Sequence, residues 1–146
     1  MDEFTLEPGI GEPLNRLEQA GWRLYVATNQ PDIARGLLDF ELLSDMNQRV
    51  LSELPIEAIE VCPHDDRDRC ECRKPKPGML IRISERTGIE IKKSFMIGDS
   101  WRDVAAARAV ECAAIMLDRE YNRAEDSDYR VFTLNDAARL ILGLVT

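Results

Sequence analysis

The feature that most constrains the fold is a regular alternation of helix-like and strand-like hydrophobic patterns along the chain. Apolar residues spaced three and four apart predict helices, and short apolar runs predict strands. The predicted helices span 11–20, 40–54, 77–87 and 103–109, with a last one opened by Thr133. The predicted strands span 22–27, 56–61, 95–97 and 113–117. This alternation favours an α/β, Rossmann-like three-layer fold, in which helices cover both faces of a mostly parallel sheet.

Length and charge narrow the class of protein. The 146 residues fit a single domain, 1–146. The net charge of −8 has the wrong sign for binding phosphate backbones, so we expect no nucleic-acid partner. The chain shows no signal peptide and no run of apolar residues long enough for a membrane span, and we therefore expect a cytoplasmic protein.

The segment CPHDDRDRCEC concentrates the only histidine and three of the four cysteines. Cys62, His64, Cys70 and Cys72 form a C-x-H-x5-C-x-C set, and three thiolates with one imidazole suit a closed tetrahedral zinc site. Four protein ligands leave no place for water, which favours a structural zinc ion. The alternative is a chance cluster with a surface histidine. Cys112, beside two alanines, is expected to be a buried apolar residue.

The segment RKPKPG follows the cysteines directly. Arg73 and Lys74 stand between the cysteine loop and two prolines, Pro75 and Pro77, which would aim fixed cationic donors at an anion. The alternative is a solvated basic turn.

Two further polar motifs come just after predicted strands, where open α/β sheets bind their ligands. In GDSWRD, Asp99 and Asp103 present carboxylates suited to Mg²⁺ or to a neighbouring lysine, and helix capping is the alternative for Asp103. The segment Thr28-Asn29-Gln30 also reads as a simple turn.

In their order along the chain, TNQPDIARG, CPHDDRDRCECRKPKPGML and FMIGDSWRD resemble the haloacid dehalogenase (HAD) superfamily. Within it they are most similar to phosphatases that act on D-glycero-D-manno-heptose 1,7-bisphosphate or on histidinol phosphate. The resemblance runs from about Leu6 to Leu117. It implies a HAD-like fold and a phosphatase of a small sugar phosphate, with an aspartyl-phosphate intermediate, catalytic Mg²⁺ and structural Zn²⁺.

The resemblance also implies roles for single residues. Thr28 would hydrogen-bond the transferring phosphoryl group, and Lys74 would stabilise its charge. Asp99 would bind Mg²⁺, and Asp103 would orient Lys74.

By the same resemblance, Asn29 and Arg73 would contact the substrate. These roles agree with the chemistry, because phosphoryl transfer depends mostly on positioning and on cationic stabilisation of the equatorial oxygens.

Members of this superfamily begin with a strand ending in Asp-x-Asp, which supplies the nucleophile and the general acid/base. The chain has no such motif near Met1. The resemblance therefore implies that this central strand is missing, and we expect negligible phosphatase activity from residues 1–146 alone. Strands 22–27 and 95–97 should leave a gap, or self-associate through it, rather than pair directly. The alternatives are a non-catalytic phosphosugar- or metal-binding relative, and a protein that depends on a partner chain for the strand.

Overall fold

The computed structural model describes residues 10–30, 34–36, 39–64 and 68–144. The chain divides into two compact units, one made of 1–69 with 138–146 and the other of 70–137. That they fold as one domain stays a prediction. None of the helices in the described ranges combines the length and the apolar character needed to cross a membrane.

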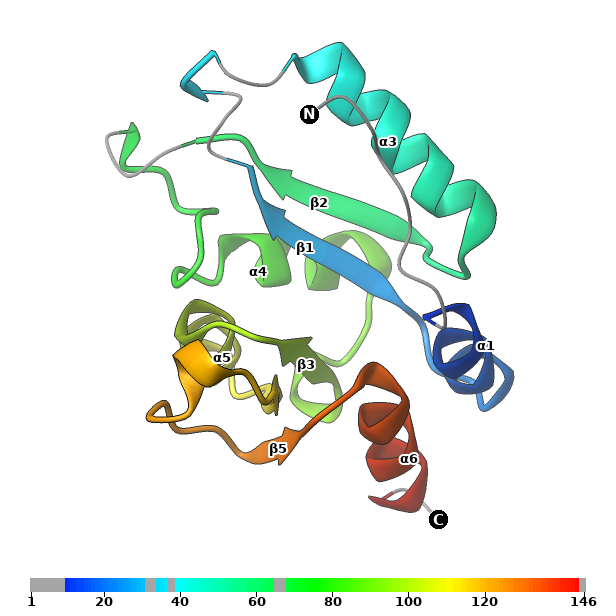
Figure 1. The fold of residues 1–146 in the computed structure, drawn as a ribbon. Helices are drawn as coiled ribbons and strands as arrows, with labels where there is room; N and C mark the ends of the chain where they lie inside the picture. Colours follow the sequence, from blue (N-terminus) through cyan, green and yellow to red (C-terminus); the bar gives the residue numbers. More distant parts are fainter. Residues whose placement is uncertain (1–9, 31–33, 37–38, 65–67, 145–146) are drawn as a thin grey trace. The chain divides into compact units, whose positions relative to one another are not determined.

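The first unit contains a two-stranded parallel sheet (Figure 1). Its elements are α1 (Gly11–Gln19), β1 (Tyr25–Asn29), α3 (Phe40–Glu53) and β2 (Ala58–Cys62). The strands pair in register from Tyr25 opposite Ala58 to Asn29 opposite Cys62. The periodic residues Leu17 and Leu43 are buried, as the helical spacing predicts.

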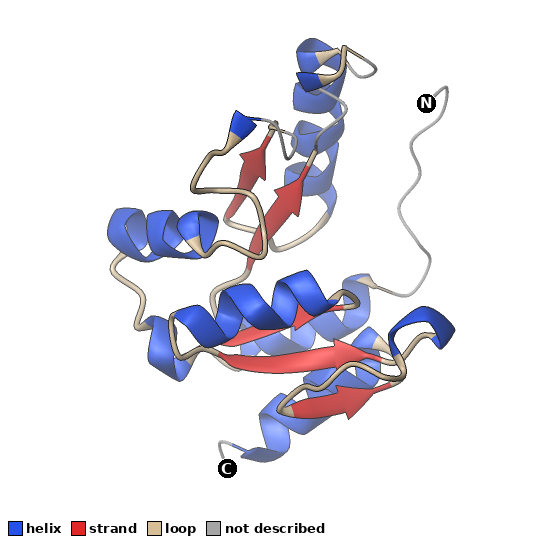
Figure 2. Ribbon diagram, turned by 90° about the vertical axis from the view of Figure 1, so that its left-hand side faces the viewer, coloured by secondary structure: helices blue, strands red, loops and turns tan. Residues whose placement is uncertain are grey.

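The second unit contains a three-stranded parallel sheet in the order β3-β4-β5 (Figure 2). Its elements are α4 (Gly78–Thr87), η2 (Ile91–Lys93), β3 (Phe95–Gly98), α5 (Trp101–Ala109), β4 (Ala113–Leu117), η3 (Glu120–Asn122) and β5 (Tyr129–Val131). A last helix, α6 (Leu134–Leu144), starts in this unit and continues into residues of the first.

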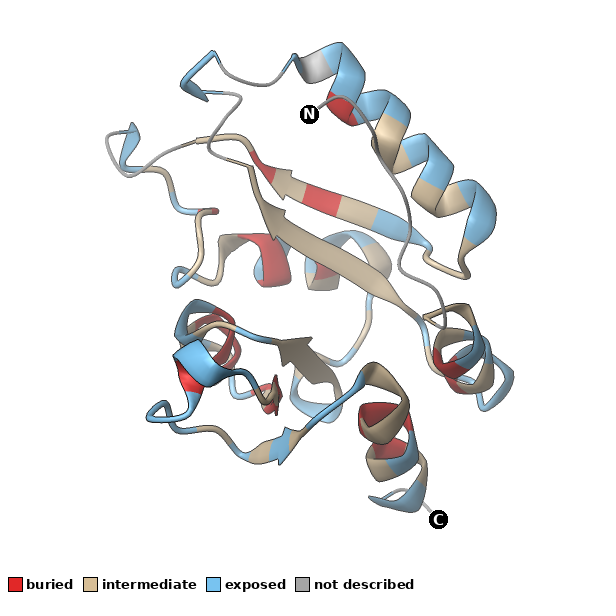
Figure 3. Ribbon diagram, viewed as in Figure 1, coloured by how far each residue is buried: buried red, intermediate tan, exposed pale blue. Residues whose placement is uncertain are grey.

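The core of the second unit lies between α5 and the sheet (Figure 3). Val104 and Ala107 of the helix meet Cys112, Ala114 and Met116 at and within β4, and all five are almost completely buried. The small side chain of Ala107 places little volume between the helix and the sheet. This packing holds the start of α5 in place at the carboxyl end of β3.

The observed helices begin and end within about two residues of the predicted ranges. Helix α4 ends at Gly88, which has a positive φ of 74°, as its position after the last helical residue predicts. The last helix begins with Thr133 accepting a hydrogen bond from the Asp136 amide at 3.0 Å. Helix α5 starts at Trp101 rather than at Asp103, because Ser100 caps it.

The strands differ from the predictions in several ways. The first predicted strand ends at Asn29 rather than Ala27, since Thr28 and Asn29 pair with β2 and so do not form a turn. The second is displaced to Ala58–Cys62, and β3 extends one residue further than predicted, to Gly98. Strand β5 was not predicted, because it has only three residues with Arg130 in the middle.

The predicted α/β class with parallel strands is confirmed, but the described strands form two sheets instead of one. Strands β1 and β3 belong to different sheets, and each pairs with a single neighbour among the described strands. Whether the two strands leave a gap or pair directly stays a prediction. Self-association through a gap stays a prediction.

Candidate active site and metal centre

A buried ion pair forms the centre of the candidate site in the second unit. Lys74 Nζ lies 2.6 Å from Asp103 Oδ1, and the two side chains are 13% and 8% exposed. These residues are 29 positions apart in the sequence. The predicted partnership of Lys74 and Asp103 is therefore present in the structure.

The position of Asp103 depends on the end of β3. The second oxygen of its carboxylate accepts a hydrogen bond from the Ser100 amide at 3.2 Å, which completes the N-terminal cap of α5. A Cβ atom on Gly98 would lie 2.1 Å from the same oxygen. Only glycine at position 98 leaves room for this carboxylate. The Asp103 side chain can therefore cap α5 with one oxygen while the other oxygen pairs with Lys74.

The loop before α4 positions Lys74. The Gly78 amide donates to Glu71 O at 3.1 Å, and a Cβ on Gly78 would lie only 2.2 Å from that oxygen. Lys76 braces the loop by donating from its amide to Arg73 O at 2.9 Å and from Nζ to Cys70 O at 2.6 Å. Arg73 and Lys74 are half-buried in this turn, whereas Pro75 and Lys76 are exposed.

Asp99 directly follows β3 and is exposed. Its carboxylate accepts a hydrogen bond from the Tyr121 hydroxyl, and its backbone carbonyl accepts one from Asn122 Nδ2 at 2.8 Å. The hydrogen bond to Asp99 raises the pKa of the Tyr121 phenol above its usual value, so the hydroxyl remains a donor at neutral pH. Neither Tyr121 nor Asn122 belongs to a motif that would have indicated this role from the sequence.

The donor chemistry at the end of β3 fits Mg²⁺. This ion prefers oxygen ligands and usually takes one or two carboxylates while it keeps several waters. Asp99 offers an exposed carboxylate, and Lys74 neutralises the nearby carboxylate of Asp103. Asp99 is therefore the residue of this group that would hold the ion.

Thr28 and Asn29 lie in the first unit, at the carboxyl end of β1. Thr28 Oγ1 accepts a hydrogen bond from Gln30 Nε2 at 3.2 Å, and Asn29 lies opposite Cys62 in the sheet. Both are half-buried. The polar end of β1 is thus next to the start of the cysteine loop.

The four predicted zinc ligands come together at the end of β2 and in the loop that connects it to α4. The Cys62 and His64 ligand atoms are 3.6 Å apart, and the Cys70 and Cys72 sulfurs are 3.5 Å apart. One ligand atom from each of the four lies within 4.8 Å of all the others. Cys62 and Cys72 are buried, whereas His64 and Cys70 are half-buried. Three sulfurs and one ring nitrogen at this spacing fit a tetrahedral zinc ion.

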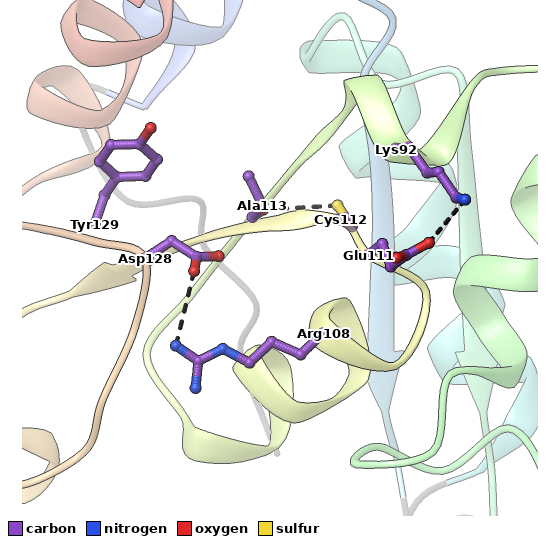
Figure 4. A pocket seen from close by; sticks show the side chains of 7 residues that line it. All are labelled: Lys92, Arg108, Glu111, Cys112, Ala113, Asp128 and Tyr129. Atoms are coloured by element: carbon purple, nitrogen blue, oxygen red, sulfur yellow. Dashed lines mark hydrogen bonds and ion pairs between the residues drawn. The ribbon is translucent and has the colours of Figure 1, made fainter.

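Cys112 does not belong to this cluster and directly precedes β4. It borders a pocket of about 500 Å³ near the start of β4 and β5, together with Lys92, Arg108, Glu111 and Asp128 (Figure 4). The side chain is 4% exposed, as predicted for an apolar residue. Burial, reinforced by the negative charge of Asp128, raises the pKa of the Cys112 thiol to about 11.

We expect Cys112 to be a poorly reactive thiol in the folded protein. Raising its pKa from 9.0 to about 11 lowers the thiolate fraction near neutral pH, by about 100-fold, and the thiolate is the nucleophile. Alkylation by iodoacetamide, followed by mass spectrometry, should therefore be slow at Cys112 and should accelerate with rising pH up to that pKa. In denaturant the rate should return to that of an ordinary cysteine. Equal rates in the folded and the denatured protein would contradict this assignment.

The sequence of this chain is similar to those of known phosphatases. A family model described as HAD-hydrolase-like matches residues 71–138. The D-glycero-beta-D-manno-heptose-1,7-bisphosphate 7-phosphatase of Pseudomonas aeruginosa is 45% identical over 123 residues, which are 80% of this chain and 68% of the relative. The protein of the same name from Bordetella bronchiseptica is 40% identical over 117 residues, covering 77% of this chain and 65% of the relative.

Solved structures show the same relationship. The crystal structure of the D,D-heptose 1,7-bisphosphate phosphatase of B. bronchiseptica, complexed with magnesium and phosphate, matches with a TM-score of 0.86 and 31% identity. That match covers 99% of this chain and 87% of the other. A putative HAD-like phosphatase of Mesorhizobium loti, with a TM-score of 0.81 and 24% identity over 97% of this chain and 76% of the other, shares the fold.

Proposed function

Because the chain belongs to the HAD-like hydrolases, we propose that it forms the site of a Mg²⁺-dependent phosphatase of D-glycero-β-D-manno-heptose 1,7-bisphosphate. The main structural support is the buried Lys74–Asp103 pair beside the end of β3. The curated relatives named for this substrate, at 45% and 40% identity, favour it over histidinol phosphate.

The chain's own residues divide the work of phosphoryl transfer. The Lys74 ammonium stabilises negative charge on the phosphoryl oxygens, and Asp103 keeps it in place through their 2.6 Å contact. Asp99 holds Mg²⁺, which when bound supplies charge neutralisation at the phosphoryl group. The nucleophilic carboxylate that would form an aspartyl-phosphate would come from an Asp-x-Asp motif at the end of a strand, and the sequence near Met1 has no such motif.

The remaining site residues serve binding. Thr28 donates a hydrogen bond to the phosphoryl group, and Asn29 contacts the substrate from the end of β1. The Arg73 guanidinium offers paired donors to a phosphate or hydroxyl group of the sugar. A zinc ion held by Cys62, His64, Cys70 and Cys72 keeps the loop closed just before Arg73.

The test measures phosphate release by a protein in which an Asp-x-Asp strand precedes Met1. We expect Mg²⁺-dependent turnover of the heptose 1,7-bisphosphate, with kcat/KM at least about tenfold above that for histidinol phosphate. Chelation of Mg²⁺ should abolish the activity, and restoring the ion should recover it. Preference for histidinol phosphate would indicate that substrate instead. Binding of a phosphosugar without release of phosphate would indicate the non-catalytic alternative.

A further inference from the structure

The contact between Tyr121 and Asp99 links two segments that are 22 residues apart in the sequence. The Tyr121 side chain projects from η3, and the residue is 70% exposed. Its ring therefore gains little from packing. Its hydroxyl nevertheless donates to Oδ2 of the Asp99 carboxylate, which leaves Oδ1 as the oxygen not taken by that bond.

The neighbouring residue, Asn122, is buried at 2% exposure. Its Nδ2 donates to Asp99 O and to Leu117 O, both at 2.8 Å. These carbonyls lie at the carboxyl ends of the adjacent strands β3 and β4. Asn122 thus ties the backbone of Asp99 to the neighbouring strand.

Asn122 is itself held firmly. Its Oδ1 accepts from the Arg119 amide at 2.9 Å and from Arg130 Nη1 at 3.0 Å, so the amide group uses both donors and two acceptor positions. Arg130, from β5, also donates to Asn122 O and to Glu125 O. A buried polar network that is fully satisfied specifies one geometry.

We propose that Tyr121 and Asn122 are positioning residues that orient Asp99 toward its metal ion, Asn122 through the backbone and Tyr121 through the carboxylate. This inference rests on the proposed function, which assigns Mg²⁺ to Asp99. Hydrogen bonds to a carboxylate ligand select which oxygen faces the metal, and their loss typically lowers metal affinity about 10–100-fold. An exposed aspartate without such partners keeps more rotamer freedom, which it must lose when it binds the ion.

The experiment titrates the 146-residue chain with Mg²⁺ and follows the backbone amide NMR signals of Gly98 and Ser100, which flank Asp99. Tyr121→Phe keeps the ring and removes only the hydroxyl. We expect it to raise the Mg²⁺ dissociation constant about tenfold at an unchanged Tm. The matched control is Tyr129→Phe, which removes a hydroxyl at the other ends of the strands and should leave Mg²⁺ affinity unchanged.

Asp99→Asn distinguishes a wrong metal assignment at Asp99 from a wrong positioning role of Tyr121. If this variant binds Mg²⁺ as the wild type does, or if the wild type does not bind the ion, the metal assignment in the proposed function is wrong and the inference falls with it. If Asp99→Asn loses binding while Tyr121→Phe retains wild-type affinity, only the positioning role of Tyr121 is overturned. Asn122→Ser, which shortens the donor, should also weaken binding, and wild-type affinity there would overturn the role of Asn122.

Discussion

Cys70→Ser is expected to reduce the zinc content from one ion per chain to well below that ratio and to destabilise the fold strongly. The hydroxyl of serine is a poor zinc ligand compared with a thiolate, so the tetrahedral set loses one of its four members. Structural zinc ions contribute apparent free energies of about 10–16 kcal/mol in zinc-finger peptides. Losing even about 3 kcal/mol would lower the Tm by about 10 °C in a chain of this size.

The measurement is metal analysis of protein purified without added zinc, together with thermal unfolding. Cys112→Ser is the matched control, because it makes the same chemical change at a buried cysteine outside the cluster. We expect this control to retain one zinc ion per chain. Stoichiometric zinc and a wild-type Tm in Cys70→Ser would exclude Cys70 as a zinc ligand and so overturn the proposed four-ligand site.

Lys74→Met is expected to lower the free energy of unfolding by about 3–5 kcal/mol, because it leaves the Asp103 carboxylate buried without its cation. Methionine keeps much of the apolar stem of lysine, so the change tests the charge more than the packing. In the double variant with Asp103→Asn, the buried charge is gone as well. The loss should then be clearly smaller than the sum of the two single effects.

The control for this experiment is Lys92→Met. Lys92 pairs with Glu111 at 2.7 Å, close to the distance between Lys74 and Asp103, but its side chain is 72% exposed. Exposed ion pairs are screened by solvent, so this variant should unfold in urea like the wild type. Equal effects of Lys74→Met and Lys92→Met would show that burial does not strengthen the Lys74–Asp103 pair.

Lys74 and Asp99 should be required for catalysis in a protein in which an Asp-x-Asp strand precedes Met1. Lys74→Ala and Asp99→Ala should each lower kcat at least about 10²-fold, because each removes charge stabilisation that matters most in the transition state. Cys112→Ala should leave kcat near that of the wild type. Wild-type kcat in Lys74→Ala or Asp99→Ala would refute the proposed roles.

Local patterns in the sequence determined the helices and the chemical groups of this protein. Helix α3 follows from apolar spacing, and Gly88 ends α4, because both depend on interactions within a few residues. The ligands from Cys62 to Cys72 could be predicted together, since a short loop brings nearby residues into contact. The candidate carboxylates were also recognised, from their place after a strand.

Contacts between distant residues were decided only by the tertiary structure. Thr28 belongs to a strand because it pairs with Val61, and the three-residue β5 exists because it pairs with β4. Local propensity contains no information about such partners. Asn122 reaches Asp99 across 23 positions, and no motif near either residue indicates it. Its role arises because parallel pairing brings the ends of β3 and β4 together, where one buried amide satisfies a carbonyl from each.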